Sequence, residues 1–243
     1  NQGIRSKSGL NLKEAVLRQV VANEQKPNVR FIGKGVIIPQ STQLSVPFQA
    51  IYLRGVTVSV IKILEQNIGQ FLQSNNLDES GELMRVGRLI ARKTIFLDEE
   101  GLDLSRWNTF AVDLKRLIEP EPGAIYRLEL SFDRPLSVYP CGNDTVILAS
   151  DEIRFKEESA RFDEGGYYYY RQYDWSDYNW EKRDDPCSDS YYFNKVEGKN
   201  VLATNLGLVA MLGQDNDMTV LVHNIQNTEP ERGVTVTAYN YQH

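Results

Sequence analysis

The most regular feature of this sequence is an alternation of apolar and polar residues with a period of two. Segments of this kind occur at 56–60, 110–114, 126–132 and 234–238. Successive side chains of a β-strand point to opposite faces, so each segment predicts a strand that buries one face. In the region 220–222 all three residues are apolar, which predicts a strand buried on both faces.

Turn-rich stretches separate these segments, for example 98–101, 120–123 and 229–233. Many short strands joined by turns are typical of antiparallel β-sandwiches. Only two stretches favour helix. Residues 67–73 have Asn67 as an N-cap candidate and an apolar face, and 12–22 have near-helical spacing but also suit a strand.

The segment 157–192 differs from the rest of the chain. It is rich in acidic residues and aromatic rings and almost lacks aliphatic side chains, so it cannot build a core of its own and is predicted to be a loop. Its aromatic residues either form a recognition surface or cover an apolar edge of the sandwich. The residues of this candidate interaction surface are Tyr167, Tyr168, Tyr169, Tyr170, Tyr173, Trp175, Tyr178 and Trp180.

Charge and hydropathy exclude several classes of protein. The net charge of −6 argues against nucleic acid as a partner, because phosphate binding needs clustered basic residues. No apolar run approaches the roughly 20 residues of a membrane-spanning helix. The chain starts at Asn1 without a signal-peptide pattern, which is expected of a piece cut from a longer protein.

We predict that the chain is not an enzyme. No GxSxG, HExxH or phosphate-binding glycine motif is present, and we assign no catalytic, cofactor-binding or metal-ligating residue. The histidines are His223, within a predicted strand, and the terminal His243, so a Cys/His zinc site cannot be assembled. The two cysteines, Cys141 and Cys187, form either one disulfide or two unrelated thiols.

Several segments resemble a known family in the order in which that family has them. They are 30–39 (RFIGKGVIIP), 44–50 (LSVPFQA), 70–77, 85–88, 104–110 and 120–127, followed by a second block at 200–210 (NVLATNLGLVA). Together they resemble macroglobulin domains of bacterial α2-macroglobulin-like proteins, particularly those of Bacteroidetes. The resemblance covers nearly the whole chain.

The resemblance implies an all-β chain of immunoglobulin- or fibronectin-III-like antiparallel sandwiches with partial flanking domains. Residues 1–27 would contain the closing strand of a preceding domain, 28–156 one macroglobulin domain, 157–192 the aromatic loop, and 193–243 the opening strands of the next domain. We expect Trp107, Phe110, Tyr126 and Leu128 in the core. Because domains of this family lie outside the cytoplasm, the resemblance favours a disulfide between Cys141 and Cys187.

The function that the resemblance implies is a non-catalytic structural domain of an exported protease inhibitor. The full-length protein would trap proteases, and this part would contact neighbouring macroglobulin domains in the periplasm or at the cell surface, with a lipoprotein anchor as one form of attachment. Many family members carry a thioester within Cys-Gly-Glu-Gln. Here the corresponding residues are Cys141, Gly142, Asn143 and Asp144, so the required glutamine is absent. The alternative function is a cell-surface adhesion or glycan-binding module that uses the aromatic loop.

Overall fold

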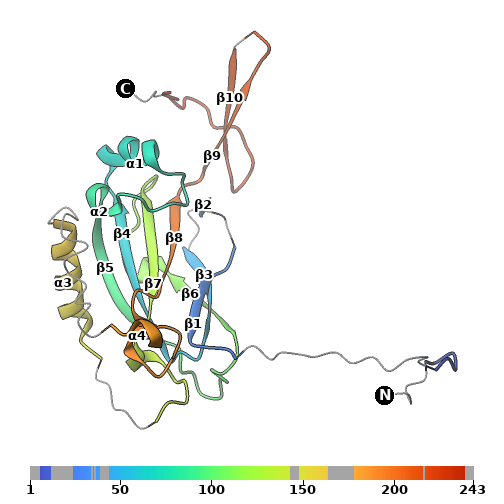
Figure 1. Cartoon of the computed structure of the whole chain (residues 1–243). Coiled ribbons are helices and arrows are strands. Elements are labelled where there is room, and N and C mark those ends of the chain that lie inside the picture. Colours follow the sequence, from blue (N-terminus) through green and yellow to red (C-terminus); the bar gives the residue numbers. More distant parts are fainter. Residues whose placement is uncertain are drawn as a thin grey trace.

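The chain forms a β-sandwich in a computed structural model, which describes residues 6–11, 24–33, 35, 37–38, 44–142, 148–163, 178–215 and 217–238. One sheet is antiparallel, in the order β1 (Asn28–Phe31), β3 (Ser45–Ile51), β6 (Asn108–Asp113). The other has the order β2 (Ile37–Ile38), β8 (Val196–Ala203), β7 (Ile125–Ser131), β4 (Gly55–Ile63), β5 (Gly87–Phe96), and is antiparallel except between β2 and β8 (Figure 1). The predicted fold class is therefore confirmed.

The core lies between the two sheets and follows the predicted alternation. Along β7 and just beyond it, Tyr126, Leu128, Leu130 and Phe132 are buried, whereas the residues between them are half-buried on the outer face. Tyr126 and Leu128 are thus core residues, as predicted. Phe110 is half-buried against Phe48, with ring centroids 5.6 Å apart. The prediction for Trp107 was wrong, because its ring lies outside the core, 4.2 Å below the Arg30 guanidinium.

The outer face of the five-stranded sheet is partly covered by a helix that the sequence did not predict. This helix, α3 (Asp151–Asp163), lies along β5 (Figure 1). Thr94 on β5 donates hydrogen bonds from its backbone nitrogen and its hydroxyl to Asp151, at 2.9 and 2.6 Å. The helix explains why β4 is buried even at its polar positions Thr57 and Ser59.

The remaining helices are short and lie at the ends of the sandwich. The predicted helix at 67–73 is confirmed as α1 (Ile68–Ser74), although Asn67 donates its side-chain amide to the Val86 carbonyl instead of capping the helix. The other predicted helix, 12–22, falls outside the described residues. The others are η1 (Glu65–Asn67), α2 (Leu83–Val86), η2 (Leu114–Arg116), η3 (Arg134–Leu136), η5 (Trp180–Lys182) and α4 (Asp189–Tyr192).

The C-terminal part of the chain divides between the sandwich and a separate hairpin. Strand β8 lies in the block predicted to open the next domain, yet it pairs with β7 along its whole length. Strands β9 (Leu206–Leu212) and β10 (Met218–Asn224) form a separate two-stranded sheet, with one further bridge from His223 to Pro230, and extend beyond the sandwich (Figure 1). The predicted burial of 220–222 on both faces was wrong, since Leu221 is 53% exposed, and residues 234–238 do not form a strand.

Candidate functional site

The predicted aromatic surface is described only at its C-terminal end. Tyr167, Tyr168, Tyr169, Tyr170, Tyr173 and Trp175 lie outside the described residues. The Tyr178 ring contacts Phe193 and Trp180, with centroids 5.1 and 6.3 Å away. Trp180 itself is 67% exposed, and the Arg183 guanidinium lies 4.6 Å above its ring. An interaction role for this surface stays a prediction. In the part of it that the structure describes, Trp180 has the exposed ring.

The two cysteines, 46 residues apart in the chain, meet in the structure. Cys141 and Cys187 form a disulfide with their Cα atoms 5.3 Å apart. The segment on the C-terminal side is held further by hydrogen bonds, since the Cys187 backbone nitrogen donates to the Asp185 carboxylate at 2.9 Å. Tyr192 donates its hydroxyl to the Pro186 carbonyl at 2.7 Å. The two hydrogen bonds order the turn before α4, and the disulfide links this turn to Cys141.

Two tyrosines of α4 continue this attachment into the core. Tyr191 donates its hydroxyl to the Pro27 carbonyl at 2.7 Å, and the Tyr192 ring meets the Phe132 ring edge-on at 6.0 Å. Burial, reinforced by neighbouring tyrosines and Asp184, raises the pKa of Tyr191 to about 12. Burial also raises the pKa of Tyr192. Both phenols are therefore held in their neutral form.

The raised pKa of Tyr191 predicts a loss of stability in alkali. Unfolding returns the phenol to its ordinary pKa of 10.0, so between about pH 10 and 12 the unfolded state binds fewer protons than the folded state. The free energy of unfolding should therefore fall as the pH rises through this window. We expect Tyr191→Phe to be slightly less stable at pH 7, because it lacks the bond to Pro27, but to lose less stability in alkali. Urea midpoints measured from pH 8 to 12 test this, and parallel curves for the two proteins would contradict it.

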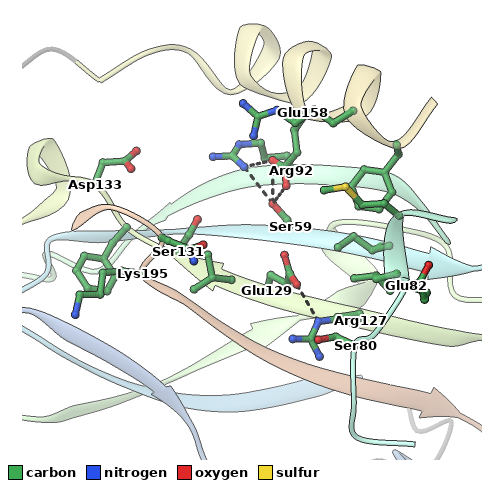
Figure 2. A pocket seen from close by; sticks show the side chains of 18 of the residues that line it. Ser59, Ser80, Glu82, Arg92, Arg127, Glu129, Ser131, Asp133, Glu158 and Lys195 are labelled. Atoms are coloured by element: carbon green, nitrogen blue, oxygen red, sulfur yellow. Dashed lines mark hydrogen bonds and ion pairs between the residues drawn. The ribbon is translucent and has the colours of Figure 1, made fainter. Parts of the chain in front are cut away.

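A groove of about 680 Å³ lies on the outer face of the five-stranded sheet, on the side covered by α3. Figure 2 shows its floor, formed by side chains of β4, β5 and β7, with α3 above it. Its walls come from α2 and the loop before it, from α3, and from the segment that joins α4 to β8. The lining residues are Ser59, Ile61, Ser80, Glu82, Leu83, Met84, Arg85, Arg92, Arg127, Glu129, Ser131, Phe132, Asp133, Glu158, Arg161, Phe162, Tyr192, Asn194, Lys195 and Val196.

The floor of this groove consists of charged side chains that pair with one another. Arg92 on β5 donates to the Glu158 carboxylate of α3, and Ser59 donates its hydroxyl to the same group at 3.3 Å (Figure 2). Next to them, Arg127 donates to Glu129 at 2.8 Å, within β7. The side chains of Arg92 and Arg127 are each only 11% exposed. A partly buried pair is screened less by salt than a surface pair, so these pairs are expected to be well ordered.

A glycine makes room for this arrangement. A Cβ atom at Gly198 on β8 would overlap the guanidinium of Arg127. The amide of Asn200, two residues on, accepts from Arg127 at 3.2 Å and donates to the Leu77 and Glu79 carbonyls at 2.8 and 2.7 Å. Gly198 and Asn200 therefore determine where the Arg127 guanidinium lies in the groove floor.

Sequence reasoning did not find this groove. Alternation placed Arg127 and Glu129 on the outer face of a predicted strand, which was a usable signal for the floor. Ser59 and Arg92 lie opposite each other because β4 pairs with β5, and Glu158 joins them only because α3 lies against β5. Among the described residues, no group of three or more His, Cys, Asp or Glu side chains is placed to hold a metal ion. In the same part of the chain no helix is long and apolar enough to span a membrane.

Comparisons with known proteins give likeness in structure only. No protein-family model matches the chain, and no curated protein matches it in sequence. A crystal structure of native Escherichia coli α2-macroglobulin spanning domains MG0-NIE-MG1 is similar over 96% of this chain and 56% of that chain, with 11% identity and a TM-score of 0.44. A crystal structure of its NIE-MG1 domains is similar over 86% of this chain and 75% of that chain, with 14% identity and a TM-score of 0.46. The chain thus spans 56% of the length of the first, and the fold assignment rests on the strand pairing described above.

Proposed function

We propose that this chain is a non-catalytic structural domain of an exported α2-macroglobulin-like protease inhibitor of the Bacteroidetes type. The full-length protein would trap the attacking protease, and this part would position neighbouring macroglobulin domains. The proposal starts from the sequence motifs quoted above. The first two of them contribute β1 and β3, which are neighbours in one sheet, with Phe31 opposite Phe48.

The observation that best supports a scaffold role is the β9–β10 hairpin. One face carries Leu206, Leu208, Ala210 and Leu212, and the other carries Val209, Met211 and Leu221. Leu208 and Leu212 are 58% and 70% exposed. A two-stranded hairpin is marginally stable alone, and exposed apolar faces of this kind mark contact surfaces. A hairpin with two apolar faces suits a position between packed domains, where both faces become covered.

The disulfide supports an extracytoplasmic location. Cys141–Cys187 is the kind of structural bond that persists in oxidising compartments and is rare in the cytosol. We therefore propose the periplasm or the cell surface as its location, with a lipoprotein anchor as one form of attachment. The charge of −6 fits protein partners better than nucleic acid.

The test of this function uses the full-length protein and several endoproteases. Each protease is incubated with the protein, and residual cleavage of a large protein substrate is compared with that of a small peptide substrate. Steric trapping spares the large substrate while the small one is still cut. If both substrates are cut at the uninhibited rate by every protease, protease trapping is wrong.

The alternative, a glycan-binding module, rests on one described feature. Trp180 has an exposed ring of the kind that stacks on sugars. If the chain binds cell-surface polysaccharide and Trp180→Ala abolishes that binding, this alternative gains support over the scaffold role.

A further inference from the structure

The groove on the outer face of the five-stranded sheet contains more positive charge than its own carboxylates neutralise. Its lining has five cationic side chains against four carboxylates, a difference of one. The cations are Arg85, Arg92, Arg127, Arg161 and Lys195, and the carboxylates are Glu82, Glu129, Asp133 and Glu158.

Every carboxylate of the lining already has a cationic partner. Glu82 pairs with Arg85 at 3.0 Å, Glu129 pairs with Arg127 at 2.8 Å, and Glu158 pairs with Arg92. Asp133 accepts from Arg154, which stands outside the groove lining. Within the described residues, Arg161 and Lys195 are left without a carboxylate.

These two cations differ from ordinary surface charges. The Nε atom of Arg161, in the last turn of α3, is buried and has no hydrogen-bond partner among the described residues. The Lys195 ammonium lies 4.5 Å above the ring of Tyr191, which is not itself a lining residue, and this contact leaves its charge unneutralised. A cation that is partly removed from water and unpaired attracts an anion more strongly than a hydrated one does. The Nε atom of Arg92, in the floor, is also buried and unpartnered.

The rest of the lining favours a peptide over a sugar. The lining also contains apolar side chains, among them Leu83, Met84 and Phe162 from the helices and Val196 at the start of β8. The aromatic rings of the lining, Phe132, Phe162 and Tyr192, are at most 7% exposed, so they offer no open face on which a sugar could stack. An extended peptide presents alternate side chains to one side and can satisfy charged and apolar positions in turn.

We propose that this groove binds an extended acidic peptide segment of a partner protein, whose carboxylates pair with Arg161 and Lys195. The proposal is independent of protease trapping by the full-length protein. The ligand is a peptide in which carboxylate side chains are separated by apolar residues. The charges of Arg92 in the floor and Glu158 in the wall already pair with each other, so they leave Arg161 and Lys195 as the cations that meet this ligand.

The test measures binding of a labelled peptide to the whole chain by fluorescence anisotropy. The probe is a fluorescein-labelled octapeptide of alternating glutamate and valine, and the comparison probe has lysine in place of glutamate. We expect the acidic probe to bind with a Kd below about 1 mM and the lysine probe not to bind. Binding should weaken as salt rises from about 50 to 500 mM, because the pairs are electrostatic.

Variants assign the binding to the groove. Arg161→Gln and Lys195→Gln should each weaken binding about tenfold, as expected for loss of one charge-assisted pair. Arg183→Gln, a matched control at an exposed cation outside the groove lining, should leave it unchanged. Gly198→Ala keeps every charge but displaces the Arg127 guanidinium, and should also weaken binding. Absence of binding by the unaltered chain, or equal binding by Arg161→Gln, Lys195→Gln and Arg183→Gln, overturns the proposal.

Discussion

A chain that ends at Asn194 is expected to lose cooperative folding, whereas a chain that ends at Thr204 should fold nearly as well as the full chain. The two truncations differ by β8. This strand pairs with β7 from Ser131 opposite Val196 to Ile125 opposite Leu202, and its side chains Val201 and Ala203 are completely buried. Truncation at Thr204 removes only the hairpin and the residues after it.

The size of the effect depends on the contribution of β8. Burial of Val201 and Ala203, the backbone ladder with β7, and the three hydrogen bonds of Asn200 together amount to roughly 10 kcal/mol. Small domains have a total stability of about 5–15 kcal/mol. Without β8, β7 would also become an unpaired edge strand, which promotes aggregation.

Urea denaturation followed by far-UV circular dichroism distinguishes the two chains. The chain that ends at Thr204 serves as the matched control, because it loses more than 30 residues but no core strand. A sigmoidal transition with an unchanged midpoint for the chain that ends at Asn194 would contradict the prediction. It would also show that residues 28–156 fold without β8, as the domain division in the sequence analysis implies.

The sequence correctly predicted strands that have the core on one face and the outer surface on the other. In 126–132 the alternation of residues matches the burial of alternate side chains, because β7 has the core on one face and the outer surface on the other. The same reasoning was incomplete for β4. Its polar positions Thr57 and Ser59 are buried next to α3. This helix contacts the rest of the protein through Asp151 and Glu158 and also through Phe155 and Phe162, which pack against buried apolar residues. The alternation at 234–238 does not form a strand, although the chain just before it bridges to β10 between His223 and Pro230.

The candidate site shows the same limit more strongly. Cys141 and Cys187 could be proposed as a pair because they are the only two cysteines. The groove could not be proposed, since its floor joins Ser59, Arg92 and Glu158 from three elements that are far apart in the sequence. No sequence pattern marks Gly198 as a groove residue, because its role depends on where the Arg127 guanidinium lies. Side-chain chemistry that depends on tertiary contacts is invisible to local patterns.

Replacing both cysteines, as Cys141→Ser with Cys187→Ser, is expected to lower the free energy of unfolding by about 4 kcal/mol. The estimate comes from the entropy that a cross-link between residues 46 positions apart removes from the unfolded chain. For a domain of this size it corresponds to a fall in Tm of roughly 8–16 °C. Both cysteines are changed together so that no unpaired thiol remains. Thermal and urea denaturation of the two proteins measure the difference.

Reduction of the unaltered protein provides the control, since it breaks the same bond without changing side chains elsewhere. Reductant should lower the urea midpoint of the unaltered protein to that of the double variant and leave the double variant unaffected. Two titratable thiols in the native, unreduced protein would contradict the disulfide itself.

The m-value shows whether the disulfide acts on the unfolded chain or through native contacts, because a cross-link keeps the unfolded state compact and so reduces the m-value. If the disulfide acts through the unfolded chain, its removal must raise the m-value as well as lower the midpoint. A lower midpoint with an unchanged m-value would instead assign the stabilisation to native contacts around α4, namely those of Tyr191 and Tyr192 with Pro27 and Phe132.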